Sequence, residues 1–188
     1  MSVACLRVRA VCRAVNYGRY FSRTSAVNMS AKVGDSLPSV DLFENDPGTK
    51  VNTAEAFASG KHIIFGVPGA FTPGCSKTHL PGYIEDFSKL EAKGVKSANC
   101  VSVNDPFVMQ AWGENQGAAG KVRMLADTCG AFTSQLGLDL PAVQHVLGNV
   151  RCKRFAMVVN DGKIEKLNVK PDGTGLTCSL STSLCDEL

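Results

Sequence analysis

The stretch from residue 63 to residue 79 constrains the fold most, because it joins an apolar run to the start of a helix. Ile63-Ile64-Phe65 indicates a buried strand, and the Gly and Pro residues that follow it indicate a turn. Thr72 suits the N-cap of a helix and Pro73 its first position, where a missing N–H costs nothing. Cys75 is then the third helical residue, where unpaired N–H groups and the helix dipole favour an anion. The sequence therefore predicts a thiolate, the attacking form of cysteine, at this turn.

Three residues of this stretch carry a resemblance to a known family. Pro68, Thr72 and Cys75 fit the pattern Pro-x-x-x-Thr-x-x-Cys, which resembles the active-site signature of peroxiredoxins. The string Val-Pro-Gly-Ala-Phe-Thr-Pro-Gly-Cys-Ser is similar to the peroxiredoxin 5 (atypical two-cysteine) subfamily, and the resemblance extends over residues 32–180. It implies a thioredoxin-like α/β fold, a mixed central sheet flanked by helices, with peroxiredoxin-type extensions. A buried structural cysteine at position 75 is the alternative.

Composition favours one ordinary globular domain. The 188 residues are 44% hydrophobic and 20% charged, and the net charge of +3 gives no reason to expect nucleic-acid binding. No apolar run approaches the roughly eighteen residues that a membrane span needs. The eight cysteines include no Cys-x-x-Cys, which argues against a zinc knuckle or a thioredoxin-type dithiol. We expect mostly free thiols, and no metal, haem or flavin.

The N-terminal segment has the composition of a targeting sequence. Residues 1–34 contain five arginines, several serines and no acidic residue, which is typical of a mitochondrial transit peptide. We expect residues 1–31 to be a removable targeting segment and residues 32–188 the thioredoxin-like peroxiredoxin domain. A basic tail without an address is the alternative. A start at Met29 would give a cytoplasmic form, whereas the terminal Asp186-Glu187-Leu188 departs from the Ser-Lys-Leu-like ending of the resembled subfamily and argues against a peroxisomal form.

Hydrophobic periodicity and turn signals alternate between strands and helices. Strands are predicted at 39–43, near 51, and at 62–67, 95–103 and 122–126, with a hairpin of 151–159 and 163–169. Helices are predicted at 53–57 capped by Thr53, at 73–93 kinked at Pro81-Gly82, after Asp105, at 131–136, and within 175–184. This order indicates a layered α/β fold with a mixed sheet.

Attack on a peroxide needs a cation where the leaving oxygen gains negative charge. Arg154 is the candidate, because a guanidinium stays charged and offers several directional donors, and the resemblance maps the family's active-site arginine onto it. On strand parity Arg154 shares a face with Cys152, Ala156 and Val158; an exposed strand arginine is the alternative. Thr72 has two candidate tasks, capping the helix and hydrogen-bonding the sulfur or the peroxide. Pro68 would shield the site from water and shape the turn.

The oxidised product would be a sulfenic acid at Cys75, which condenses with a second thiol. Cys178 matches the position of the subfamily's resolving cysteine, and the glycines at 173 and 175 favour a mobile loop there. Cys185 and Cys152 are rival resolving thiols.

The other cysteines and the histidines carry weaker signals. Cys100 is predicted to be buried and inert, and Cys129 exposed. His79 lies one helical turn after Cys75 and invites a Cys-His nucleophile interpretation. No protease-like sequence surrounds it, so we predict that His79, like His62 and His145, is structural or solvent-facing.

The function that these residues predict is thiol-dependent reduction of hydrogen peroxide and organic hydroperoxides, in antioxidant defence. The resemblance implies that thioredoxin supplies the reducing dithiol, and we expect a monomer or weak homodimer. The alternative is a redox-regulated binding or signalling module with incidental turnover. A general disulfide oxidoreductase is weakened by the missing Cys-x-x-Cys.

Overall fold

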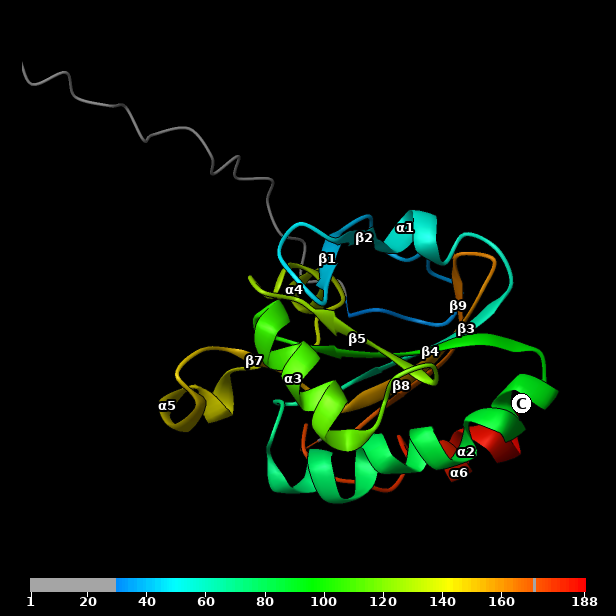
Figure 1. The fold of residues 1–188 in the computed structure, drawn as a ribbon. Helices are drawn as coiled ribbons and strands as arrows, with labels where there is room; N and C mark the ends of the chain where they lie inside the picture. Colours follow the sequence, from blue (N-terminus) through cyan, green and yellow to red (C-terminus); the bar gives the residue numbers. More distant parts are fainter. Residues whose placement is uncertain (1–29, 171) are drawn as a thin grey trace, which may run out of the picture.

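The computed structural model describes residues 30–170 and 172–188, which form a mixed sheet covered by helices on both faces (Figure 1). In this part of the chain seven strands follow the order β2-β1-β5-β4-β3-β8-β9, and β6 pairs with β7 apart from them. The strands are β1 (Asp41–Glu44), β2 (Lys50–Asn52), β3 (Lys61–Gly66), β4 (Val95–Ser102), β5 (Val122–Ala126), β6 (Asp139–Leu140), β7 (Arg151–Cys152), β8 (Phe155–Asn160) and β9 (Lys163–Val169). The expected thioredoxin-like α/β fold is confirmed.

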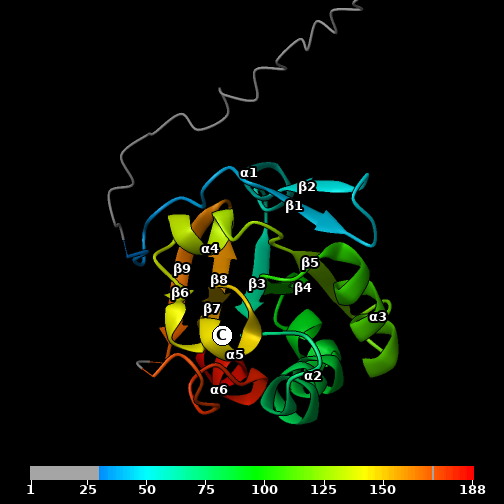
Figure 2. The same ribbon diagram turned by 90° about the vertical axis from the view of Figure 1, so that its left-hand side faces the viewer.

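Helices cover the sheet in two layers. The helical segments are α1 (Thr53–Ala56), the π-helical turn η1 (Cys75–His79), α2 (Leu80–Ala92), α3 (Pro106–Gln116), α4 (Ala131–Gln135), the 3-10 turn η2 (Pro141–Val143), α5 (Gln144–Leu147) and α6 (Ser181–Glu187). Residues of α2, α3 and α6 pack into one hydrophobic cluster, and residues of α4 belong to the other. Figure 2 shows α2 and α6 at one end of the view and α1 and α4 at the other.

β3, near the centre of the sheet, contributes side chains to both hydrophobic clusters. β3 pairs in parallel with β4 and antiparallel with β8. Successive strand side chains point to opposite faces. Ile63 and Phe65 therefore pack with α2 and α3, while Ile64 packs on the opposite face. All three are fully buried. The turn that follows β3 therefore begins from a strand that is packed on both faces.

The helix after β3 begins at Pro73, as predicted, but it is wider over its next turn. Cys75–His79 is π-helical, and the N–H of Leu80 donates to the carbonyl of Cys75. Pro81 has no N–H for the carbonyl four residues before it, and its ring would clash there in a regular helix. The wider π-helical turn removes the need for the missing N–H and makes room for the proline ring. The irregularity therefore precedes the predicted kink at Pro81-Gly82.

The predicted long strand 151–159 is wrong, because its two parts pair with different partners. Arg151–Cys152 is β7 and pairs with β6, an element that the sequence did not indicate. The chain leaves the ladder, and the N–H of Arg154 donates to the carbonyl of Gly173 at 2.7 Å. Strand parity therefore fails across the break: Cys152 lies in the cluster opposite to that of Ala156.

Two helices also differ from prediction, one in its N-cap and the other at its C-terminal end. Asn52, not Thr53, caps α1, and its side-chain oxygen accepts from the N–H groups of Ala54 at 3.1 Å and Glu55 at 3.4 Å. The Thr53 hydroxyl is buried and contacts Val40 instead. The final helix begins at Ser181 and continues to Glu187, beyond the predicted range.

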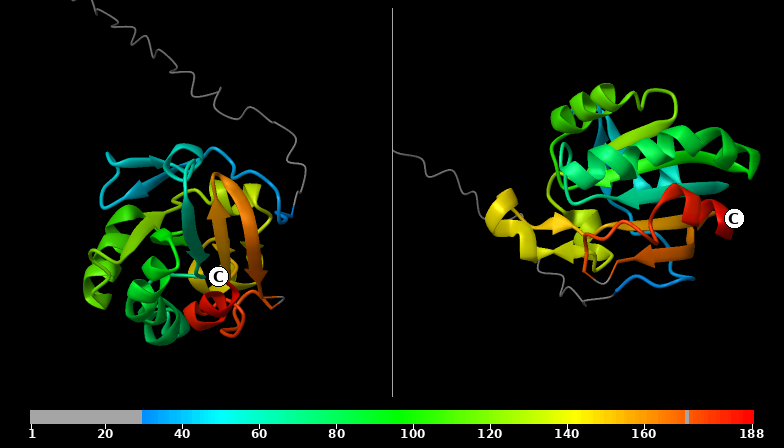
Figure 3. Two further views of the ribbon diagram at one scale, coloured as in Figure 1. Left: turned by 90° about the vertical axis from the view of Figure 1, so that its right-hand side faces the viewer. Right: turned by 90° about the horizontal axis from the view of Figure 1, so that it is seen from below.

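α6 lies beside the C-terminal part of α2 (Figure 3). The Ser181 hydroxyl donates to Asp86 at 2.8 Å, and Lys93 donates to the carbonyl of Cys185. These contacts bring the segment that contains Cys178 next to the helix that contains Cys75. Within the described ranges, no helix is long and apolar enough to cross a bilayer.

Candidate active site

Cys75 lies in the first turn of the helix after β3, and its side chain is fully buried. Both terminal nitrogens of the Arg154 guanidinium lie 3.5 Å from its sulfur. Two residues that are 79 positions apart in the sequence therefore meet. The structure brings together the nucleophile and the cation that the sequence predicted.

Several contacts position Arg154, which is only 4% exposed. Nε donates to the carbonyl of Thr174 at 2.8 Å, and Nη1 lies 3.1 Å from Nδ1 of His79. The ion pairs found among the described residues do not include Arg154. Its charge is therefore not offset by a neighbouring carboxylate and is directed at the sulfur.

Gly74 leaves the space that the guanidinium occupies. A Cβ at this position would lie 3.3 Å from Nη2 of Arg154 and 3.7 Å from Cδ1 of Leu176. The first distance is tighter than ordinary van der Waals contact. A side chain at position 74 would therefore press on the Arg154–Cys75 contact.

Thr72 and Pro68 shape the turn before the helix. The carbonyl of Thr72 accepts from the N–H of Ser76 at 2.9 Å, which places Thr72 at the N-cap. Its hydroxyl, however, donates to the carbonyl of Gly69 at 2.9 Å. In the part of the chain that the structure describes, this hydroxyl makes neither a capping bond nor a bond to Cys75. Pro68 is buried two residues after the end of β3.

Backbone strain marks the same turn. Phe71 has a φ of 58°, in the left-handed region that non-glycine residues rarely occupy, and its side chain is 54% exposed. Such conformations persist where the surrounding structure imposes them, and they are concentrated at functional sites.

His79 contacts Arg154 and is buried, which agrees with the structural alternative of its prediction and excludes the solvent-facing one. It is fully buried, and its Nε2 lies 2.8 Å from the carbonyl oxygen of Ser179. The pKa of His79 is lowered to about 4, mainly by burial, with a smaller lowering from the nearby Arg154 and an opposing effect of the Ser179 bond. The imidazole is therefore neutral at physiological pH. In the sequence, the only indication that His79 lies near Cys75 was its spacing of one helical turn from that residue.

Cys178 lies in a half-buried turn just before α6. The segment around it is tied at both ends, because Arg154 binds the carbonyl of Thr174 and His79 binds that of Ser179. The hydroxyl of Tyr83 also donates to the Ser179 carbonyl at 2.8 Å. The structure therefore brings the Cys178 segment against the same cluster that surrounds Cys75.

The other thiols have less reactive surroundings. Burial raises the pKa of the Cys100 thiol and that of the Cys152 thiol well above the usual range. Cys152 also packs on the sheet face opposite to Cys75. Burial raises the pKa of Cys185 as well. Cys129 is exposed.

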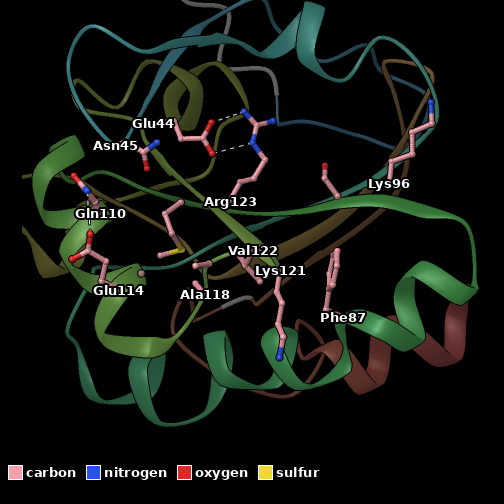
Figure 4. A pocket seen from close by; sticks show the side chains of 15 residues that line it. Glu44, Asn45, Phe87, Lys96, Gln110, Glu114, Ala118, Lys121, Val122 and Arg123 are labelled. Carbon is pink, nitrogen blue, oxygen red and sulfur yellow. Dashed lines mark hydrogen bonds and ion pairs between the residues drawn. The ribbon is translucent and has the colours of Figure 1, made fainter.

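A separate pocket of about 460 Å³ lies between α2, α3 and β5, near the C-terminal half of α2 (Figure 4). Phe87 and Met124 line it, and Arg123 forms a two-bond ion pair with Glu44, at 3.0 and 2.6 Å. The described residues that line it include no cysteine or histidine. The nucleophile therefore lies elsewhere. Residues 30–170 and 172–188 also contain no group of three or more potential metal ligands.

Fold and site together define a class: a thioredoxin-like protein with a buried cysteine that faces an arginine at a helix start. A model of the Redoxin family matches residues 32–182. Peroxiredoxin-2E-2, chloroplastic, from Oryza sativa subsp. japonica is 41% identical over 85% of this chain and 74% of that protein. Reduced Prx3 from Vibrio vulnificus in complex with H2O2 has a TM-score of 0.78 and 40% identity, over 84% of this chain and 99% of that chain. Peroxiredoxin 5 from Alvinella pompejana has a TM-score of 0.72 and 40% identity, over 84% and 98%.

The chain belongs to the peroxiredoxins, with likeness to the peroxiredoxin 5 subfamily. It is a thiol-dependent peroxidase, an oxidoreductase that acts on peroxides. The alternative of a binding or signalling module is not favoured. The chloroplastic relative is consistent with an organellar presequence at the N-terminus. The predicted targeting segment itself lies almost entirely outside the described residues.

Proposed function

We propose that Cys75 reduces hydrogen peroxide and organic hydroperoxides in the first step of a two-cysteine cycle. The Cys75 thiolate attacks one peroxide oxygen, so that an S–O bond forms and the O–O bond breaks. The departing oxygen takes up a proton and leaves as water or an alcohol, and Cys75 becomes a sulfenic acid. The observation that carries this proposal is the guanidinium of Arg154, with both terminal nitrogens 3.5 Å from the buried sulfur.

Arg154 would stabilise the charge that develops on the departing oxygen. Fixed donors in a site that excludes water act more strongly than they do in water. Thr72 lies three residues before Cys75, and its hydroxyl, which binds Gly69 in the resting structure, would turn to bind the peroxide. Pro68, buried two residues after β3, would keep water from the turn.

The second step would join Cys75 to Cys178. The Cys178 thiol attacks the sulfenic sulfur, water leaves, and an intramolecular disulfide forms. Two cysteines can be bridged only when their Cα atoms come within about 7 Å. Because Cys75 is buried in a helical turn and faces Arg154, this turn must unwind locally. Cys152 and Cys185 are weaker candidates, since burial raises the pKa of each thiol.

A dithiol protein, thioredoxin, would then reduce the disulfide and restore both thiols. The peroxide supplies the oxidant and the thioredoxin dithiol the two electrons, so the cycle balances without a bound cofactor. A monomer or weak homodimer fits the exposed apolar side chains of Phe71, Phe107 and Val146, which are 54%, 62% and 66% exposed.

The cycle is tested by peroxide consumption with thioredoxin, its reductase and NADPH. We expect steady turnover only when all components are present. A Cys129→Ser variant serves as the matched control, because it removes an exposed thiol to which the proposed cycle gives no role. Turnover that does not depend on thioredoxin would reject thioredoxin as the reductant.

We further propose that residues 1–31 direct the chain to mitochondria and that residues 32–188 form the catalytic domain. The acid-free, arginine-rich composition supports the first proposal. Residues 1–34 fused to a passive fluorescent protein should carry it into mitochondria, and a fusion that begins at Met29 should stay in the cytosol. A purely cytosolic location of the longer fusion would remove the mitochondrial assignment.

A further inference from the structure

The partners of His79 determine the state of its ring. A guanidinium only donates hydrogen bonds, so Nδ1 of His79 accepts from Nη1 of Arg154 at 3.1 Å. A backbone carbonyl only accepts, so Nε2–H donates to Ser179 at 2.8 Å. The ring is therefore the neutral tautomer with its proton on Nε2. The cycle proposed above gives this buried residue no task.

The two bonds connect the surroundings of both cysteines. Arg154 is the residue that contacts the sulfur of Cys75, and Ser179 directly follows Cys178. His79 itself is the last residue of the π-helical turn that begins at Cys75. If this turn unwinds, His79 leaves with it, and both bonds break together.

We propose that His79 is a positioning residue that couples the two cysteines: it orients Arg154 toward Cys75 and holds the Cys178 segment closed until the turn that contains Cys75 moves. This inference rests on the proposed two-cysteine cycle. In the resting protein the bond from His79 to Ser179, together with that from Tyr83 to the same carbonyl, holds the Cys178 segment, while the bonds to His79 and Thr174 orient the guanidinium. Unwinding of Cys75–His79 removes a tether of the Cys178 segment in the same motion that frees the Cys75 sulfenic acid.

A histidine that only fills the core would behave differently. His79 does pack edge-on against Phe65 and Tyr83, with ring centroids 5.3 and 5.6 Å apart. Loss of packing alone would lower overall stability and raise the exposure of thiols across the molecule. Coupling instead predicts a change confined to Cys178 and to the oxidation rate of Cys75.

The variants that separate these cases are His79→Phe and His79→Gln. Phenylalanine retains an aromatic ring against Phe65 and Tyr83 but removes both nitrogens, whereas glutamine offers one acceptor and one donor. His62→Phe is the matched control. His62 is also buried, bonds Ser97 at 2.8 Å and the carbonyl of Ser59 at 3.0 Å, and packs on Phe57 on the opposite face.

The first measurement is the rate at which iodoacetamide alkylates Cys178 in the reduced protein without peroxide, followed by peptide mapping. His79→Phe should raise this rate about tenfold relative to exposed Cys129, and His79→Gln should stay within about threefold of the parent. An equal rise at Cys178 in His62→Phe, or no rise in His79→Phe, would overturn the coupling. Since no peroxide is present, this outcome does not depend on whether the chain turns over.

The second measurement is the single-turnover oxidation by hydrogen peroxide. Trp112, the single tryptophan, donates to the Ser76 hydroxyl at 3.0 Å, so its fluorescence reports on the turn beside Cys75. His79→Phe should slow the oxidation phase about tenfold, with His79→Gln again near the parent. An unchanged rate in His79→Phe would overturn the claim that His79 orients Arg154.

A third measurement needs no variant and covers the case in which His79→Phe does not fold. Nitrogen NMR of histidine-labelled protein should show the Nε2–H tautomer of His79 in the reduced state and the loss of its hydrogen-bonded shift in the disulfide state. An unchanged His79 signal after the Cys75–Cys178 disulfide has formed would reject the coupling while leaving the peroxidase activity intact.

Discussion

At Cys75, the proposed chemistry depends on one guanidinium. Arg154 approaches the sulfur with two nitrogens, and the carbonyl of Thr174 and the ring of His79 fix its orientation. A lysine could supply the charge at this position, but not the two directional donors or the bond to Thr174. The arginine therefore offers two oriented N–H donors in addition to its charge.

Arg154→Lys should slow single-turnover oxidation of Cys75 by about 10- to 100-fold, because one or more fixed donors to the developing charge are lost. The later reduction of the disulfide by a dithiol should keep its rate. Stopped-flow fluorescence of Trp112 measures both steps. Arg123→Lys, which changes an arginine paired with Glu44 in the distant pocket, is the control. An oxidation rate equal to that of the parent would place Arg154 outside the reaction.

At the scale of elements, the end of β3 sets the position of Arg154 through a close packing contact. Gly66 pairs with Phe155, the first residue of β8, and a Cβ on Gly66 would lie 2.1 Å from Cε1 of the Phe155 ring. Only glycine at position 66 leaves room for the Phe155 ring. Because Arg154 directly precedes Phe155, a displaced ring would also displace the guanidinium.

Gly66→Ala should therefore destabilise the fold by roughly 1–3 kcal/mol, the usual cost of overpacking a core. Denaturant unfolding measures this free energy. Phe155→Leu removes the ring that clashes, so the double variant should lose less stability than the sum of the two single variants. Simple additivity would show that the two residues do not press on each other.

The segment before α6 is the second part of the chain on which the proposed cycle depends. Cys178→Ser should permit one rapid oxidation, then fail to turn over with thioredoxin, and it should accumulate sulfinic acid at Cys75. Mild oxidation of the parent, followed by peptide mapping, should find Cys75 joined to Cys178. A bond from Cys75 to Cys152, to Cys185 or to another chain would reject Cys178 as the resolving thiol.

Local signals in the sequence predicted most elements, because their causes are local. The Asp105 cap with Pro106, the strand at 122–126 and the turn at 160–162 all lie where residue type indicated them. The break at residue 153 was missed because it depends on pairing with β6, which short-range pattern does not show. The sequence could not decide whether His79 is structural or solvent-facing, because its partners lie 75 and 100 positions further along the chain.

At the scale of the whole molecule, His79 links stability to pH. Burial lowers its pKa to about 4 in the folded state, against 6.5 for the group in its ordinary state. Between these values the unfolded chain binds the proton and the folded protein does not, so stability falls as pH drops. Arg154 faces one side of the ring, and protonation would place a second cation 3.1 Å from it.

The free energy of unfolding should therefore decrease between pH 6.5 and pH 4 by on the order of 3 kcal/mol more in the parent than in His79→Phe, which cannot titrate there. Urea unfolding at several pH values measures the difference, in which contributions from other groups cancel. Above pH 7 the two slopes should agree. Parallel curves down to pH 4 would mean that His79 is not held neutral by the fold.

The most direct test of the central claim is the peroxidase rate of Cys75→Ser in the full chain with thioredoxin and its reductase. Because Cys75 is the only nucleophile assigned to the peroxide, we expect turnover to fall to the background of the assay without enzyme. Circular dichroism and unfolding should show a retained fold, and Cys129→Ser should retain full activity. Appreciable peroxide reduction by a folded Cys75→Ser protein would contradict the account.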